Sequence, residues 1–284
     1  MTVRILALVL AGAMVSSRGM AQSLPPDLAA ERAAYRDWLL TSATSPFAVL
    51  AQRNIGTGVT LGPAEADVPL EGLEPGRVVE RSGTVFFEQA GTARPLPRWR
   101  PVAFGKYRLM AGGLPGQSLL TVSTGSPRNP KPPAYYDFDP SLNRVVRLRP
   151  PPRQAEIRLL APDGQVVVAT EAGTVEIDAG GKRVPLTVRR IPVPGGEESE
   201  LEIFFRDGTN DNGSYPAGRF VALIPVSGDQ YRLDLNRARN PFCAYSSVFA
   251  CPAPWRGNLI PGPVEAGEKY LGGGLSAPPV PEDR

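Results

Sequence analysis

Residues 156–190 read EIRLLAPDGQVVVATEAGTVEIDAGGKRVPLTVRR and decide the fold. Short apolar runs, many of them β-branched or alternating with polar residues, are separated by turn residues such as Pro162-Asp163-Gly164 and Gly180-Gly181. Runs of this kind, with no helical period between them, predict antiparallel strands joined by turns. The expected strands are Glu156 to Leu160, Val166 to Thr170, Thr174 to Asp178 and Arg183 to Arg190, with Ala172-Gly173 as a further turn.

The same pattern continues on both sides of this meander. The chain has 32 Pro and 30 Gly among 284 residues, a density of helix breakers that excludes long helices from most of its length. We therefore predict a mainly β protein with two antiparallel β-rich domains. Further strands are expected over Val59 to Gly62, Arg77 to Arg81, Thr84 to Glu88, Tyr107 to Met110, Ser118 to Val122, Leu201 to Phe205, Arg219 to Ile224 and Tyr231 to Leu235.

One helix is predicted ahead of the strands, from Asp27 to Leu40. Prolines precede it, Asp27 is a suitable N-cap, and the Ser45-Pro46 pair disfavours its continuation. Its apolar face consists of Leu28, Tyr35, Trp38 and Leu39.

Composition shifts divide the chain into segments. Two Pro-rich stretches lie between the β-rich regions, and the last residues, LGGGLSAPPVPEDR, have little apolar surface to bury. We expect an N-terminal helix within 22–44, a first β-domain over 45–125, a Pro-rich connection over 126–152, a second β-domain over 153–270 and a disordered tail over 271–284.

The N-terminus has the order of a secretory signal peptide. Arg4 is followed by the apolar run Ile5 to Val15, and Gly19-Met20-Ala21 places small residues at a cleavage site. Residues 1–21 are therefore predicted to be removed, which leaves a periplasmic or secreted protein without a membrane span. The alternative is an uncleaved membrane anchor.

The charge and the absence of histidine exclude several function classes. Loss of Arg4 and Arg18 with the signal peptide lowers the formal net charge from +3 to +1, so no excess of positive charge indicates nucleic-acid binding. Without histidine, Ser-His-Asp and Cys-His catalysis and His-ligated zinc are impossible. We predict no cofactor and no metal site.

Cys243 and Cys251 are the two cysteines of the chain. An even pair, eight residues apart, in an oxidising compartment predicts one disulfide bond. A two-thiolate metal site is a poorer interpretation, because no histidine is present to complete it.

The block FFRDGTNDNGSYPAGRF (204–220), followed by YRLDLNRARNPFCAYSSVFACPAPWRGNLIPGPVEAGEKY (231–270), carries a long, ordered set of motifs. This set resembles the signature of a bacterial family catalogued as domain of unknown function 1684. The resemblance spans roughly residues 31–270 and implies a β-rich protein of unassigned activity. Ser214, Leu235, Arg239 and Trp255 depart from the pattern, where Thr, Phe, Tyr and Pro are usual. The matching residues are Asp207, Thr209, Tyr215, Gly218, Arg219, Asp234, Asn236, Ala238, Asn240, Pro241, Cys243, Ala244, Cys251, Pro252, Pro254, Asn258, Leu259, Ala266, Gly267 and Glu268.

The first β-domain is similar to the forkhead-associated-like stretch of the same family. Residues 59–89, VTLGPAEADVPLEGLEPGRVVERSGTVFFEQ, carry that likeness, which implies a forkhead-associated-like antiparallel β-sandwich. The usual Gly-Arg after the first strand is Gly62-Pro63 here, and the histidine of the Ser-x-x-His element is missing. The resemblance therefore implies a β-sandwich scaffold without phosphopeptide recognition.

The candidate site lies where three predicted strands of the second domain end or begin. Antiparallel neighbours would bring these ends together, with a hairpin closed at Asn212-Gly213. Arg219, predicted to be buried, should pair with an aspartate. The patch is either a set of structural Asp–Arg bridges or a pocket for an anion or polar substrate. Its expected members are Asp207, Thr209, Tyr215, Arg219, Asp234, Asn236 and Asn240.

Residues 207–213 superficially resemble a calcium loop. Asp207, Thr209 and Asp211 occupy the first three ligand positions, but Asn212 and Gly218 stand where an EF-hand has Gly and Glu. A polar turn, whose side chains bond their own backbone, is the alternative.

Two candidate functions are consistent with these observations. The first is an exported, non-catalytic protein of the cell envelope that binds a small polar ligand or an envelope protein. The alternative is a carboxylate-dependent hydrolase in the second domain. Its candidate acids are Asp207, Asp234, Glu265 and Glu268.

Overall fold

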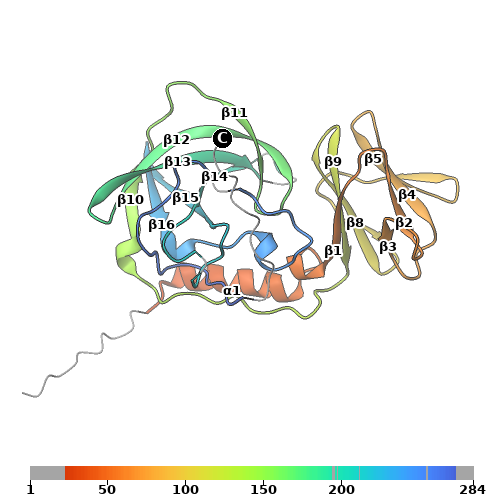
Figure 1. Cartoon of the computed structure of the whole chain (residues 1–284), viewed down its shortest axis with the longest axis horizontal. Helices are drawn as coiled ribbons and strands as arrows, with labels where there is room; N and C mark the ends of the chain where they lie inside the picture. Colours follow the sequence, from red (N-terminus) through yellow and green to blue (C-terminus); the bar gives the residue numbers. More distant parts are fainter. Residues whose placement is uncertain (1–22, 194–195, 197, 211, 254, 273–284) are drawn as a thin grey trace, which may run out of the picture.

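The computed structural model describes residues 23–193, 196, 198–210, 212–253 and 255–272. The predicted signal peptide and all of the predicted tail except Leu271 and Gly272 lie outside the described residues. The described part is mainly antiparallel β with one α-helix, α1 (Pro26–Thr41), as the sequence predicted (Figure 1). Within it, no helix is long and apolar enough to cross a membrane. The forkhead-associated likeness of the first domain stays a prediction.

Helix α1 begins one residue before the position expected for it. Its N-cap is Pro25, not Asp27, because Pro26 already supplies the φ angle of the first helical position. Asp27 instead lies in the first turn and receives a hydrogen bond from Arg237 at 2.5 Å. Of the predicted apolar face, Leu28 and Leu39 are buried, and Tyr35 and Trp38 are half-buried against the second domain.

Residues 49–124 form two sheets that share one core. The sheet orders are β1-β9-β8-β7 and β3-β2-β4-β5-β6, and all pairs are antiparallel except β2 with β3. Alternate strand residues such as Val78, Phe87 and Leu109 fill the space between the sheets. The strands are β1 (Val49–Asn54), β2 (Val59–Gly62), β3 (Val68–Pro69), β4 (Gly76–Arg81), β5 (Thr84–Gln89), β6 (Thr92–Pro95), β7 (Val102–Phe104), β8 (Tyr107–Leu114) and β9 (Gln117–Thr124), with the 3₁₀ turn η1 (Pro46–Ala48) before β1.

The second domain is one antiparallel sheet in the order β10-β16-β15-β14-β13-β12-β11. The sheet curls, so that Arg149 after β10 exchanges backbone hydrogen bonds with Thr174 of β12. The strands are β10 (Asn143–Arg147), β11 (Glu156–Leu160), β12 (Val166–Ala179), β13 (Lys182–Pro192), β14 (Ser199–Phe205), β15 (Arg219–Ser227) and β16 (Gln230–Asp234); the 3₁₀ turns are η2 (Pro140–Leu142), η3 (Leu235–Arg237) and η4 (Phe242–Ala244).

Two local expectations need correction. The segment 126–152 is more than a connection, because it contributes β10 to the edge of the sheet and Tyr135 forms a bridge with Glu268. The two strands expected on either side of Ala172-Gly173 are one strand, β12, with a register shift at that point. Gly173 has φ +144°, and a Cβ there would collide with the Arg149 carbonyl oxygen. The glycine therefore permits a close approach of two strands and makes no turn.

Both faces of the curled sheet are packed. Leu186, Ile203 and Val221 belong to the core on one face. The other face packs Phe204 and Phe220 together with Val49 of β1, so this core reaches the first domain.

Candidate functional site

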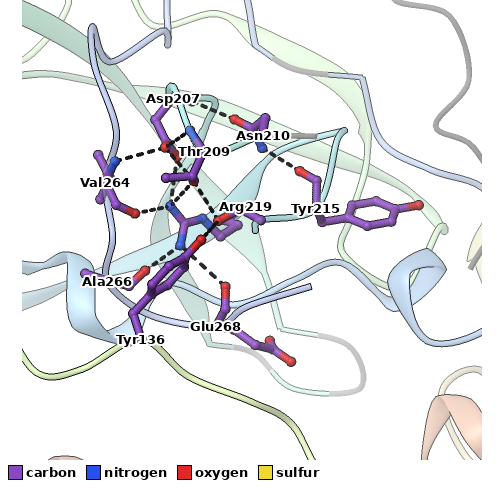
Figure 2. A network of polar contacts seen from close by, with 10 residues as sticks. Tyr136, Asp207, Thr209, Asn210, Tyr215, Arg219, Val264, Ala266 and Glu268 are labelled. Atoms are coloured by element: carbon purple, nitrogen blue, oxygen red, sulfur yellow. Dashed lines mark hydrogen bonds and ion pairs between the residues drawn. The ribbon is translucent and has the colours of Figure 1, made fainter. Parts of the chain in front are cut away.

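Arg219, which was predicted to pair with an aspartate, forms a buried ion pair with Asp207 (Figure 2). Arg219 is the first residue of β15, and its side chain is fully buried. Its Nη2 donates to Asp207 Oδ2 at 2.8 Å and to the Val264 carbonyl oxygen at 2.9 Å, while Nη1 donates to the Ala266 carbonyl oxygen. The guanidinium thus binds the segment that contains Val264 and Ala266 to the sheet by hydrogen bonds.

Asp207 organises the loop that joins β14 to β15. Its Oδ1 accepts hydrogen bonds from Thr209 N at 2.8 Å, Thr209 Oγ1 at 2.7 Å and Val264 N at 3.0 Å. Asn210 extends the loop, accepting from Asp207 N at 2.6 Å and donating to the Tyr215 carbonyl oxygen at 2.5 Å. The predicted hairpin is present, because β14 and β15 pair antiparallel up to Phe205 and Arg219 and residues 212–213 form a turn. The connection is longer than a two-residue turn, and side chains of its described residues organise it.

Most hydrogen-bonding groups of this network are used within the protein, although Arg219 Nε is buried and has no hydrogen-bond partner among the described residues. Arg219 has no solvent exposure, and both its Nη atoms are bonded to protein groups. Asp207 uses both carboxylate oxygens in the same way. Asp211, the third ligand position of the calcium-like turn, lies outside the described residues, and the described residues hold no group of three or more potential metal ligands.

Asp234 and Asn236 belong to a separate cluster beside α1. Asp234 Oδ1 accepts from Asn236 Nδ2 at 2.9 Å, and its Oδ2 accepts from Arg237 Nε at 3.3 Å. Arg237 also pairs with Asp27 and Glu31 of the helix. These two predicted site residues therefore anchor α1 and do not join the Arg219 network.

Tyr215 and the two cysteines form a third cluster. Both cysteines are free thiols in the structure, so the predicted disulfide is absent there. The thiols hydrogen-bond to each other, and the Tyr215 hydroxyl lies 3.2 Å from Cys251 Sγ. The hydrogen bond from Cys243 lowers the pKa of Cys251 to about 7, while the bond with Cys251 and burial raise the pKa of Cys243.

Asn240 connects the core to a buried carboxyl group. Its backbone N–H donates to Glu268 Oε2 at 2.9 Å, and Tyr245 donates to Glu268 Oε1. The Tyr245 hydroxyl is 3.1 Å from that of Tyr35 on α1. Burial raises the pKa of Glu268 to about 7, although the hydrogen bonds from Tyr245 and Asn240 act to lower this pKa. Glu265, by contrast, is exposed.

A pocket of about 360 Å³ opens where Tyr35 meets the sheet. Its walls come from α1, the turn between β11 and β12, the end of β13, the start of β14 and the segment 239–242. Apolar surface from Trp38, Ile191 and Phe242 dominates, and the size suits a small molecule. Of the residues that line this pocket, Asn240 alone had been predicted from the sequence as a site residue. Two signals in the sequence could have indicated the pocket: the aromatic residues Tyr35 and Trp38 on α1, and Arg239, which stands where Tyr is usual in the signature.

The polar side of the pocket is built around Glu202. This residue of β14 is 3% exposed and accepts from Arg239 Nη2 at 2.9 Å. Burial raises the pKa of Glu202, and Arg239 opposes that rise. Arg239 also reaches Glu200 at 3.5 Å. Asn240 Oδ1 is buried and has no hydrogen-bond partner among the described residues.

Fold and site together define a mainly β protein whose seven-stranded sheet holds a buried Arg–Asp pair and carries a pocket against helix α1. The family model described as "Protein of unknown function (DUF1684)" matches residues 133–269. This match confirms the resemblance that the C-terminal signature predicted. The match covers the Arg219 network and most of the pocket, but not Tyr35 and Trp38.

Among solved structures, the chain is similar to the solution NMR structure of an uncharacterized protein from Haloarcula marismortui. The two are 31% identical, with a TM-score of 0.42, over 49% of this chain and 76% of that chain. No curated protein matches the chain.

Proposed function

We propose that this chain is an exported, non-catalytic protein that binds a small polar ligand in the pocket between α1 and β14. The observation that carries the proposal is the composition of that pocket. Apolar and aromatic walls surround the buried carboxylate of Glu202, and Asn240 lines the same pocket with its buried Oδ1 lacking a partner among the described residues. A buried polar atom without a partner costs free energy, and a ligand donor that reaches Oδ1 after a rotation of the Asn240 side chain would recover it.

Export is the second part of the proposal and is supported by the sequence. Arg4, the apolar run after it and the small residues before position 22 are arranged as in a cleaved signal peptide. In an oxidising compartment, the neighbouring Cys243 and Cys251 thiols would become the disulfide that the sequence predicts.

The binding test is a titration of the mature protein with a mixture of small amines, alcohols and acids, followed by backbone amide NMR spectra. Shifts are expected at Trp38, Glu202 and Asn240, with none in β4 and β5 of the first domain. Shifts confined to other surfaces, or no shift at millimolar concentration, would overturn the proposed function.

The alternative, a carboxylate-dependent hydrolase, has weaker support. Its candidate acids differ in environment: Asp207 and Asp234 are paired with arginines, Glu265 is exposed, and Glu268 is buried behind Tyr245. Burial raises the pKa of Glu268 to about 7, as expected of an acid catalyst, but Glu268 is not among the pocket-lining residues.

A further inference from the structure

We infer that the ligand of this pocket is an organic cation, a protonated amine carried on an apolar body. The inference rests on the proposed ligand-binding function and specifies its chemistry. Three features carry it: the balance of charge on the walls, an unused hydrogen-bond acceptor, and the aromatic rings of α1 and η4.

The walls carry more negative than positive groups. Asp163, Glu200 and Glu202 line the pocket against one cation, Arg239. That guanidinium is already held by both glutamates, through the same Nη2 atom. An incoming carboxylate would meet these glutamates, whereas an ammonium group would be attracted to them.

The hydrogen-bonding capacity of the pocket is also biased toward a donor ligand. Asn240 uses its amide Nδ2 on the Lys269 carbonyl oxygen at 3.1 Å, and its Oδ1 is a buried acceptor without a partner among the described residues. Because Asn240 lines the pocket, a rotation of its side chain would bring Oδ1 to the ligand. The Glu202 carboxylate is a second acceptor at the same wall. An ammonium group has three N–H donors and no acceptor, so it matches this set.

The aromatic side chains provide the complementary surface for the body of the ligand. Trp38 packs against Phe242 with ring centroids 5.6 Å apart and stacks on Tyr35 at 5.7 Å. Faces of Trp and Tyr attract cations as well as apolar groups, and they do so more strongly where water is excluded. The pocket therefore fits an amine next to a hydrocarbon or aromatic group better than a fully polar ion.

The test uses two matched series of probes on the mature full-length chain. Tryptamine, tryptophol and indole-3-propionate share an indole body, and hexylamine, hexanol and hexanoate share an alkyl body. Dissociation constants come from calorimetry or NMR titration. In at least one series we expect the amine to bind about tenfold more tightly than its alcohol, and the acid to bind worst. Added salt should weaken amine binding alone.

Variants assign the effect to the pocket. Glu202→Gln should weaken amine binding about tenfold and leave alcohol binding unchanged. Glu176→Gln is the matched control, because it removes the same charge from β12 at a surface ion pair with Arg149. If Glu202→Gln does not fold, Glu200→Gln, on a half-exposed side chain, should give a smaller loss in the same direction.

Two outcomes overturn the inference, and they can be told apart. If alcohols or acids bind in the pocket as tightly as the amines, the ligand class is wrong and the proposed binding function stands. If no probe of any charge shifts the signals of Trp38 and Asn240, both the ligand class and the binding function are wrong.

Discussion

At the scale of one residue, the stability of the fold depends on Arg219, a fully buried charge whose Nη atoms bond to protein groups. Arg219 satisfies Asp207 and the carbonyl oxygens of Val264 and Ala266, three partners from two distant segments. Removing one member of such a pair leaves the other charge buried and unpaired, which is far more unfavourable than losing a surface ion pair.

We predict that Arg219→Ala lowers the free energy of unfolding by about 3–5 kcal/mol, because the Asp207 carboxylate loses its counter-charge in a dry site. Urea denaturation followed by circular dichroism measures this. The control is Arg147→Ala, whose pair with Asp229 is largely exposed, and which should change stability by less than about 1 kcal/mol. A similarly small effect of Arg219→Ala would contradict the structural role.

The raised pKa of the buried Glu268 predicts that the stability of the protein depends on pH. Burial raises the pKa of this carboxyl group from 4.5 to about 7, so the folded state holds the proton more tightly than the unfolded state. Its contribution to stability is therefore complete below about pH 4.5 and is lost as the pH rises through about 7.

The measurement is the free energy of unfolding of the wild type relative to Glu268→Gln between pH 4 and 8. We expect this difference to fall by about 3 kcal/mol as the pH increases, on the scale of 1.4 kcal/mol for each pKa unit. Glu265→Gln, on an exposed side chain three positions away, is the control and should follow the wild type. A difference independent of pH would refute the prediction.

At the scale of the element, β12 depends on the missing side chain of Gly173. Its φ of +144° and the neighbouring Arg149 carbonyl oxygen leave no room for a Cβ. We predict that Gly173→Ala destabilises the protein by about 1–3 kcal/mol. Gly125→Ala, which meets open space at an ordinary φ, should have little effect in the same thermal denaturation experiment. Equal melting temperatures of the two variants would argue against this account of the strand.

The redox state of Cys243 and Cys251 decides whether the loop between them is closed by a covalent bond. After export we predict a Cys243–Cys251 disulfide, worth about 2.5 kcal/mol for a loop this short on the chain-entropy model. Thiol titration of protein isolated from the envelope without reductant should find no free thiol after denaturation. Two titratable thiols would show that the reduced pair of this structure is the cellular form.

For the whole molecule, we predict that the mature chain begins at Gln22 and is found in the periplasm or outside the cell. The basis is the small residue Ala21 at the end of the signal-like segment. N-terminal sequencing of protein from envelope and cytoplasmic fractions measures this. An intact Met1 on cytoplasmic protein, with no protein in the envelope, would rule out export.

The sequence alone determined the local features of this protein. Strands such as β2 and β11 have the predicted bounds, and α1 lies in the predicted segment, because alternation and turn residues act over a few positions. That Arg219 pairs with an aspartate was also predictable, since a strand charge next to core residues requires a partner, but the structure decided that the partner is Asp207.

Only the tertiary structure decided which of these residues share a site. Asp234 and Asn236 turn toward α1, while Asn240 joins a pocket whose other walls are far away in the chain. The contact between Tyr35 and Tyr245 spans 210 residues, and β10 pairs with β16 although its sequence looks like part of a connection. Such contacts follow from the curl of the sheet and the docking of the helix, which depend on the summed packing of many side chains rather than on any local pattern.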